Sequence, residues 1–241
     1  MNAEQMTETM TAGTGPRFFV SAAMFDLDGT LIDSINVYYK VVQTVFDRLG
    51  LSRVSRDQIY AAVEDGRFYW DRVLPAEETT AEKGFMQRAM VLAREVYPDI
   101  FRRTVDVFDG VPAFLADLQA RGIRIGVVTA TPGDRMVEKE ALLAQKGVRD
   151  CIDVLVTNDD APNPKPAPDT ILACCERLSI RPAHGLYAGD TSVDIRAGKA
   201  AGTRTAAVLT GFDRRQTLMD EHPDIVLNRV TDLAGMIVKK R

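Results

Sequence analysis

The chain has 241 residues, of which 46% are hydrophobic and 27% charged, an ordinary composition for a globular protein. Lysine and arginine total 30 and aspartate and glutamate 34, so the net charge is −4, whereas nucleic-acid binders are usually basic. Three cysteines are too few for a disulfide framework, and no apolar run approaches the roughly 20 residues that span a bilayer. We therefore expect a cytoplasmic protein with neither a nucleic-acid nor a membrane partner.

The first 16 residues are polar, contain several threonines and glycines, and include Glu4 and Glu8. A secretory signal needs a basic start followed by an apolar stretch, and this segment has neither. We predict a disordered tail over 1–16.

After the tail, short apolar runs alternate with segments of helical periodicity. The predicted strands are 18–25, 123–128, 152–156, 185–188 and 205–209, with a weaker one at 225–227 that a short helix follows. The predicted helices are 112–121, 133–145, 168–178 and 193–201. Such apolar runs are typical of buried parallel strands. Their alternation with helices predicts an α/β fold, a doubly wound parallel sheet with a Rossmann-like core.

One long segment between the first two strands breaks this alternation and shows no convincing strand. The helices expected there are 37–49, 57–63, 67–74 and 85–97, with stop signals at Gly50 and Pro98. The sequence thus predicts a mainly helical insert over 35–105. It would interrupt an α/β core made of 17–34 and 106–241.

Polar residues follow the ends of four predicted strands. They are Asp26, Asp28 and Thr30 after the first strand, Thr129 after the second, Lys165 after the third, and Asp190 and Asp194 after the fourth, and Gly29 and Ala130 stand beside them in the same loops. In open parallel sheets, ligands bind beyond the carboxyl ends of the strands. We therefore expect these loops to converge on one site.

The pair Asp26 and Asp28 carries most of the chemical information in these loops. Residues two apart in an extended chain point the same way. Two ionised carboxylates held close together repel, which pushes their pKa values apart and suits one nucleophile and one proton donor. Asp190 would complete an oxygen-rich site of the kind that Mg²⁺ prefers, and Gly29 permits a tight turn beside the ligand.

These motifs, in this order, resemble those of the haloacid dehalogenase-like hydrolase superfamily. They read Phe25-Asp26-Leu27-Asp28-Gly29-Thr30-Leu31-Ile32-Asp33-Ser34, Val127-Val128-Thr129, Lys165-Pro166-Ala167-Pro168-Asp169, and Gly189-Asp190 with Asp194. The helical insert resembles that superfamily's cap domain of the first class. The run over 188–202 and Asp109-Gly110-Val111 are typical of the phosphoglycolate phosphatase-like group.

The resemblance implies a Mg²⁺-dependent phosphatase that hydrolyses a small, phosphoglycolate-like phosphorylated metabolite through an aspartyl-phosphate. Asp26 would be the nucleophile, and Asp28 would protonate the leaving group and then deprotonate water. Mg²⁺ would be held by Asp26, the backbone carbonyl of Asp28, and Asp190. Lys165 would offset negative charge on the phosphoryl oxygens.

The resemblance also implies which other residues surround the substrate. The expected substrate-binding residues are Gly29, Thr129, Ala130 and Lys165. Thr30 and Asp194 are expected to lie outside the metal ligands and support them, or, for Asp194, to orient Lys165. A helix cap or a surface ion pair is the other interpretation of Asp194. In the cap, Arg67 of Asp65-Gly66-Arg67 could bind a substrate carboxylate bidentately or could be an exposed turn residue.

Two alternatives remain open at the level of sequence. The acid at Asp28 argues against a dehalogenase, since halide leaves without a proton, and Thr30 fits phosphatases better than sugar-phosphate mutases. Ala130 stands where relatives often have Asn or Ser, and Asn158 where the phosphoglycolate phosphatase-like group often has Gly, which leaves the substrate open. A mutase of the same fold and a non-catalytic phosphometabolite-binding protein are the alternatives. The oligomeric state is open between monomer and homodimer.

Overall fold

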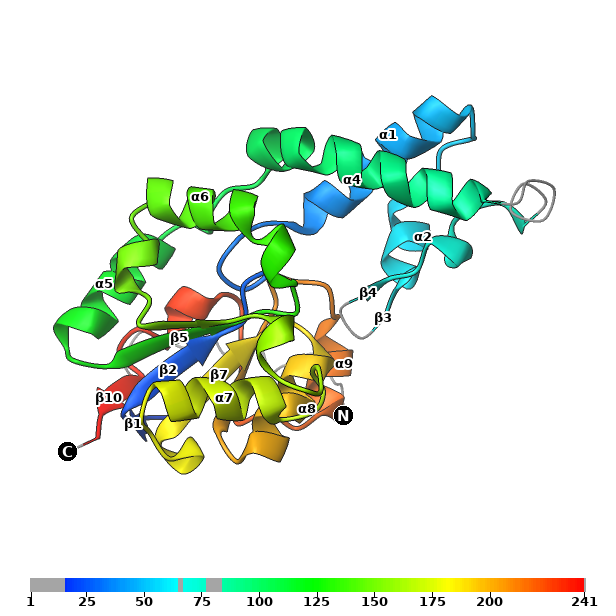
Figure 1. Cartoon of the computed structure of the whole chain (residues 1–241). Helices are drawn as coiled ribbons and strands as arrows, with labels where there is room; N and C mark the ends of the chain where they lie inside the picture. Colours follow the sequence, from blue (N-terminus) through cyan, green and yellow to red (C-terminus); the bar gives the residue numbers. More distant parts are fainter. Residues whose placement is uncertain (1–15, 65–66, 77–83, 241) are drawn as a thin grey trace, which may run out of the picture.

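The computed structural model describes residues 16–64, 67–76 and 84–240, so nearly all of the predicted tail lies outside the described residues. Its centre is a six-stranded, wholly parallel sheet in the order β6-β5-β2-β7-β8-β9 (Figure 1). The strands are β2 (Ala22–Phe25), β5 (Arg124–Val128), β6 (Val154–Val156), β7 (Gly185–Gly189), β8 (Arg204–Val208) and β9 (Ile225–Leu227). The predicted doubly wound α/β fold is confirmed, with β2 at the point where the strand order reverses.

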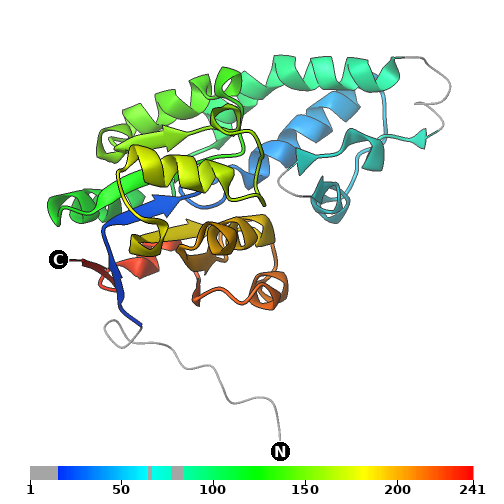
Figure 2. The same cartoon turned by 60° about the horizontal axis from the view of Figure 1, so that its bottom comes forward.

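Helices cover both faces of this sheet (Figures 1 and 2). They are α5 (Val111–Ala120) and α6 (Val137–Gln145) on one face, and α7 (Asp169–Arg177) and α8 (Ser192–Ala201) on the other. Side chains alternate along β2: Ala23 and Phe25 pack in the cluster that includes α5, whereas Ala22 and Met24 pack in the cluster that includes α7. The uniformly buried strand follows from this two-sided cover.

Several predicted boundaries are wrong in detail. The predicted strand 18–25 is two strands, because β1 (Phe18–Val20) pairs with the unpredicted β10 (Ile237–Lys239) and only β2 joins the main sheet. The predicted helix 133–145 is a 3-10 turn, η2 (Gly133–Arg135), followed by α6. Helix α9 (Arg215–Asp220) was not predicted, and 3-10 turns occupy Trp70–Arg72 (η1), Arg149–Cys151 (η3), Asn158–Asp160 (η4), Pro182–His184 (η5) and Val230–Leu233 (η6).

Between β2 and β5, the chain forms the predicted mainly helical insert. Its helices are α1 (Ile35–Leu49), α2 (Arg56–Ala61) and α4 (Phe85–Thr104). The expectation that the segment contains no strand is wrong: β3 (Val63–Glu64) and β4 (Arg67–Phe68) pair antiparallel, so 67–74 is not a helix. The backbone N–H of Tyr69 donates to Ala62 at 2.8 Å and extends this short ladder.

The last predicted helix of the insert continues past the expected stop at Pro98. Proline removes one backbone donor from a helix. Packing of the flanking turns offsets that loss, since Val96 and Phe101 are both buried and the rings of Tyr97 and Phe101 lie 5.6 Å apart.

The insert has an apolar cluster of its own, in which Val45 and Phe46 of α1 pack with Phe85 and Ala89 of α4. Tyr38, Tyr97 and Ile100 contact both this cluster and the core of the sheet. Among the described residues, no helix is both long and apolar enough to cross a membrane.

Candidate active site

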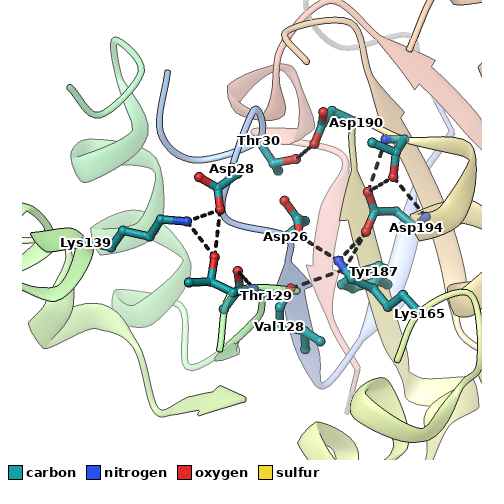
Figure 3. A network of polar contacts seen from close by, with 12 residues as sticks. Asp26, Asp28, Thr30, Val128, Thr129, Lys139, Lys165, Tyr187, Asp190 and Asp194 are labelled. Carbon is teal, nitrogen blue, oxygen red and sulfur yellow. Dashed lines mark hydrogen bonds and ion pairs between the residues drawn. The ribbon is translucent and has the colours of Figure 1, made fainter. Parts of the chain in front are cut away.

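The polar residues predicted to converge lie together beyond the carboxyl ends of β2, β5, β6 and β7 (Figure 3). Asp26 directly follows β2, and its backbone N–H donates to the carbonyl of Ala188 on β7 at 2.8 Å. This ladder bond fixes the first carboxylate beside Asp190, which follows β7. The sheet itself therefore sets the spacing of the site.

Asp26 and Lys165 form a buried ion pair, with Lys165 Nζ 2.6 Å from Asp26 Oδ1. The same ammonium lies 2.6 Å from Asp194 Oδ1 and 3.0 Å from the hydroxyl oxygen of Tyr187. The Tyr187 hydroxyl also donates to Asp194 Oδ1 at 3.0 Å. Lys165 is therefore held by three oxygens. Its own burial disfavours the charged form, but the negative charges of Asp194 and Asp26 outweigh that effect and hold its pKa well above the usual value.

Asp194 is also the acid of the capping box at the start of α8, whose N-cap residue is Thr191. Its Oδ2 accepts from the backbone N–H of Thr191 at 3.1 Å and from the Thr191 hydroxyl at 2.5 Å. The sequence left two roles open for Asp194, a helix cap or a supporting residue, and the structure combines them. The cap fixes one oxygen of Asp194 so that the other can hold Lys165.

Three acids could hold a metal ion together. One ligand oxygen from each of Asp26, Asp190 and Asp194 lies within 4.8 Å of the others, and all three residues are buried. Asp190 accepts from the Thr30 hydroxyl at 3.0 Å and from the backbone N–H of Phe212 at 2.9 Å. An all-oxygen set of this kind fits Mg²⁺.

Glycine is required beside Asp190 on two sides. A Cβ on Gly29, whose φ is +81°, would lie 2.6 Å from Asp190 Oδ2, and a Cβ on Gly211 would lie 1.7 Å from the same atom. Only glycine allows both backbones to approach this carboxylate so closely. Gly29, predicted to allow a tight turn beside the ligand, lies next to Asp190 with a positive φ.

The carboxylates of Asp26, Asp190 and Asp194, here called the acid cluster, lie buried so close together that their ionised forms repel one another. Burial, together with the charges of Asp194 and Asp28, raises the pKa of Asp26 to about 7, although Lys165 opposes the shift. Burial and the charges of Asp26 and Asp194 hold the pKa of Asp190 well above its usual value. A divalent cation would relieve this repulsion, so the cluster fits a metal site on chemical grounds as well.

Asp28 is paired with a different lysine. Lys139 of α6 forms an ion pair with Asp28 Oδ2 and bonds the hydroxyl of Thr131 at 2.6 Å, and that hydroxyl lies 3.2 Å from the same carboxylate oxygen. Burial opposes ionisation of Asp28, but the Lys139 ammonium outweighs it and lowers the pKa. The two aspartates that the sequence paired therefore lie in opposite electrostatic environments.

The loop after β5 supplies the remaining predicted core residues. Thr129 is buried, and its hydroxyl oxygen accepts from the backbone N–H of Thr131 at 3.1 Å. Ala130 is exposed between them. Arg67 lies on β4 of the insert, but its side chain, like Asp65 and Gly66, is outside what the structure describes.

Sequence reasoning named none of Lys139, Tyr187 and Tyr38 as site residues. The spacing in the sequence could have indicated Lys139. It lies three residues after Met136 and four before Leu143, so all three fall on one face of the helix, and all three are buried. The Tyr38 ring lies 5.4 Å from that of Phe212. Burial and the nearby charges of Asp28, Asp26 and Asp190 raise the pKa of the Tyr38 hydroxyl.

Curated relatives cover almost the whole chain. A phosphoglycolate phosphatase from Nitrosococcus oceani is 26% identical over 216 residues, 89% of this chain and 95% of the relative. An N-acetylmuramic acid 6-phosphate phosphatase from Pseudomonas putida is 30% identical over 191 residues, covering 79% and 83%. Pyrophosphatase PpaX from Bacillus pumilus is 27% identical over 218 residues, covering 90% and 96%.

Solved structures share the fold. A predicted phosphoglycolate phosphatase from Haemophilus somnus superposes with a TM-score of 0.75 at 19% identity, covering 90% of this chain and 97% of that one. A candidate beta-phosphoglucomutase from Thermotoga maritima gives 0.71 at 21% identity, covering 89% and 96%. The family model described as haloacid dehalogenase-like hydrolase matches residues 23–208. Together with the site at the sheet's carboxyl edge, this match shows that the chain belongs to the haloacid dehalogenase-like hydrolases.

Proposed function

We propose that the protein is a Mg²⁺-dependent phosphatase that hydrolyses a small phosphorylated metabolite through an aspartyl-phosphate on Asp26. The main observation behind the proposal is that two neighbouring aspartates, Asp26 and Asp28, have different charged neighbours. Asp26 lies in an acid cluster with Lys165, and Asp28 has a separate cation in Lys139. Two carboxyl groups in different environments suit two different chemical roles.

In the first step, an Asp26 oxygen would attack phosphorus, and the ester bond to the leaving oxygen would break. Asp28 would donate a proton to that oxygen. The negative charge of a bound phosphate raises the pKa of a nearby carboxyl, so proton uptake by Asp28 would accompany substrate binding. In the second step, Asp28 would take a proton from water, which would attack phosphorus and release Asp26 and phosphate.

Asp26 and Asp190, with the backbone carbonyl of Asp28, would hold Mg²⁺. When bound, the metal would supply positive charge to the phosphoryl oxygens and to the nucleophile. Asp194 already uses both oxygens, one on Lys165 and one on Thr191, so we assign it a supporting role. Thr129 and the backbone N–H of Ala130 would bind a phosphoryl oxygen, and Lys165 would neutralise another.

We propose that the insert, 35–105, acts as a cap that closes over the substrate and excludes water. Tyr38 supports this, because its ring contacts Phe212 of the core while its helix α1 belongs to the insert. The relatives named above take phosphoglycolate, N-acetylmuramic acid 6-phosphate or pyrophosphate by their names, so a small phosphate-bearing molecule is the substrate class that we infer.

The proposed function is tested by phosphate release from p-nitrophenyl phosphate and a panel of small phosphometabolites, each with Mg²⁺ and with EDTA. We expect Mg²⁺-dependent release and almost none in EDTA. Transfer of the phosphoryl group within a hexose 1-phosphate, without free phosphate, would show a mutase instead. Tight binding of one panel member without turnover of any would show a binding protein.

Arg67 is proposed to contact a carboxylate or second anion of the substrate from the cap. Arg67→Ala should raise KM for an acidic substrate by about 10-fold or more, because a charge-assisted contact is lost. KM for p-nitrophenyl phosphate, which has no second anion, should change little. Equal changes in both KM values would argue against this specificity role.

A further inference from the structure

Lys139 is a buried cation outside the residues that the catalytic motifs supply. It is 3% exposed and lies on α6, where Met136 and Leu143 on either side of it are also buried. A buried ammonium is costly unless charged and polar groups surround it. Among the described residues, the acid in ion-pair contact with Lys139 is Asp28.

Lys139, Thr131 and Asp28 form a closed triangle of contacts. The ammonium bonds both the Asp28 carboxylate and the Thr131 hydroxyl oxygen, and the Thr131 hydroxyl donates to Asp28 Oδ2 at 3.2 Å. A carboxylate held by two donors from different directions has little rotational freedom. Thr131 comes from the β5 loop and Lys139 from α6, so two separate elements fix the position of Asp28.

Each of the two aspartates has its own lysine. Lys165 contacts Asp26 and Asp194, whereas Lys139 contacts Asp28, and the two lysines lie on opposite sides of Asp26 in Figure 3. From this geometry we infer that Lys139 is a positioning residue, which together with Thr131 holds the Asp28 carboxyl where it can exchange a proton with the leaving oxygen and with water. The inference rests on the proposed function of the site.

A positioning role predicts an effect that depends on the leaving group. General acid catalysis contributes about 10²–10⁴-fold, and only a poor leaving group needs the acid. In Lys139→Met, formation of the aspartyl-phosphate from an alkyl phosphate should slow by about 100-fold. Formation from p-nitrophenyl phosphate should slow by no more than a few-fold, because p-nitrophenolate leaves without a proton.

The second step needs Asp28 as a base for every substrate. Lys139→Met should therefore release about one p-nitrophenol per site in a rapid burst, followed by slow steady-state turnover. Rapid-mixing absorbance and quenched phosphoenzyme measurements report the two steps separately. A purely structural role would slow the first step equally for both substrates, and that result would overturn the inference.

The control is Lys146→Met at the end of the same helix. Lys146 is exposed and pairs with Asp106 at 2.7 Å, remote from the triangle. This variant removes the same charge and should keep wild-type rates within about two-fold, as expected for a surface substitution.

Two further variants keep the test decisive if Lys139→Met does not fold. Thr131→Val retains the ion pair and removes one donor to Asp28, and it should show the same burst with a smaller loss. Adding Lys139→Met to Asp28→Asn removes both charges together and should not lower the rate of Asp28→Asn further. A further tenfold fall in the double variant, or no burst in Thr131→Val, would contradict the inference. An inactive wild-type enzyme would instead refute the proposed function.

Discussion

Asp26→Asn is expected to lower kcat by about four orders of magnitude or more, since loss of a nucleophile costs this much in other covalent mechanisms. The amide oxygen can still accept the bond from Lys165, so the fold and the lysine should stay in place. The measurement is steady-state phosphate release with saturating Mg²⁺, together with detection of phosphoenzyme after acid quench. Residual activity within tenfold of wild type, or a phosphoenzyme in the variant, would remove Asp26 from the role of nucleophile.

The same variant should be more stable than wild type without metal at alkaline pH. The pKa of Asp26 is about 7, against 3.8 ordinarily, so the folded state binds a proton that the unfolded state has lost between about pH 4 and 7. Stability from this group is therefore greatest at low pH and falls as pH rises through 7. At pH 8 the wild-type carboxylate is ionised in the folded state at a cost that asparagine does not have.

We expect Asp26→Asn to raise Tm by about 2–12 °C at pH 8 in EDTA, which corresponds to about 1–3 kcal/mol for a chain of this size. The difference should shrink as pH falls from 7 and should approach zero only near pH 4, where the unfolded state also binds the proton. Mg²⁺ should stabilise wild type more than the variant, because the variant lacks one anionic ligand. An equal or lower Tm for the variant at pH 8 would contradict the strain assigned to the acid cluster.

Lys165→Met is expected to damage both catalysis and stability. Lys165 is 8% exposed and contacts Asp26, Asp194 and Tyr187, so its removal leaves two buried carboxylates without their cation. Breaking a buried pair in this way costs about 3–5 kcal/mol, or about 6–20 °C in Tm. Loss of a group that stabilises transition-state charge should lower kcat by about 10²–10³-fold.

The damage to stability should depend on pH and on metal. It should be smaller at pH 5 than at pH 8, because the unpaired carboxylates can take up protons, and Mg²⁺ should restore part of the Tm at pH 8. Lys199→Met is the matched control, since Lys199 is an exposed lysine of α8 that bonds only backbone carbonyls in the described contacts. A Lys165→Met variant as stable and as active as this control would refute the assigned role.

The sequence by itself determined the α/β architecture, and it indicated that the loops after the central strands lie close together. Alternating apolar runs and helices can be satisfied by few folds, and in a parallel sheet the carboxyl ends of all strands lie at one edge. Asp26, Asp190 and Lys165 therefore had to approach one another once the strands were recognised. The prediction of a site at the strand ends does not depend on small errors in element boundaries, such as those of β2 and α6.

Short or tertiary-dependent elements escaped sequence reasoning. The two-residue strands β3 and β4 carry no periodicity to detect, and α4 continues through Pro98 because its flanking turns pack against α1 and the core. The intrinsic helix or strand propensity of a residue predicts local structure only weakly, and tertiary packing can override it.

Only the tertiary structure decided which side chains surround Asp26 and which surround Asp28. Lys139 follows Asp28 by 111 positions, and Tyr187 follows Lys165 by 22. At such separations no sequence spacing predicts these contacts. A buried charge takes whichever counter-charge the packed helices and loops place within hydrogen-bond reach. The sequence could thus indicate where the two aspartates lie, but it could not indicate their different pKa values. The raised pKa of Asp26 depends on its burial beside Asp194, and the lowered pKa of Asp28 depends on Lys139, which lies on the other side of Asp26 from Lys165 (Figure 3).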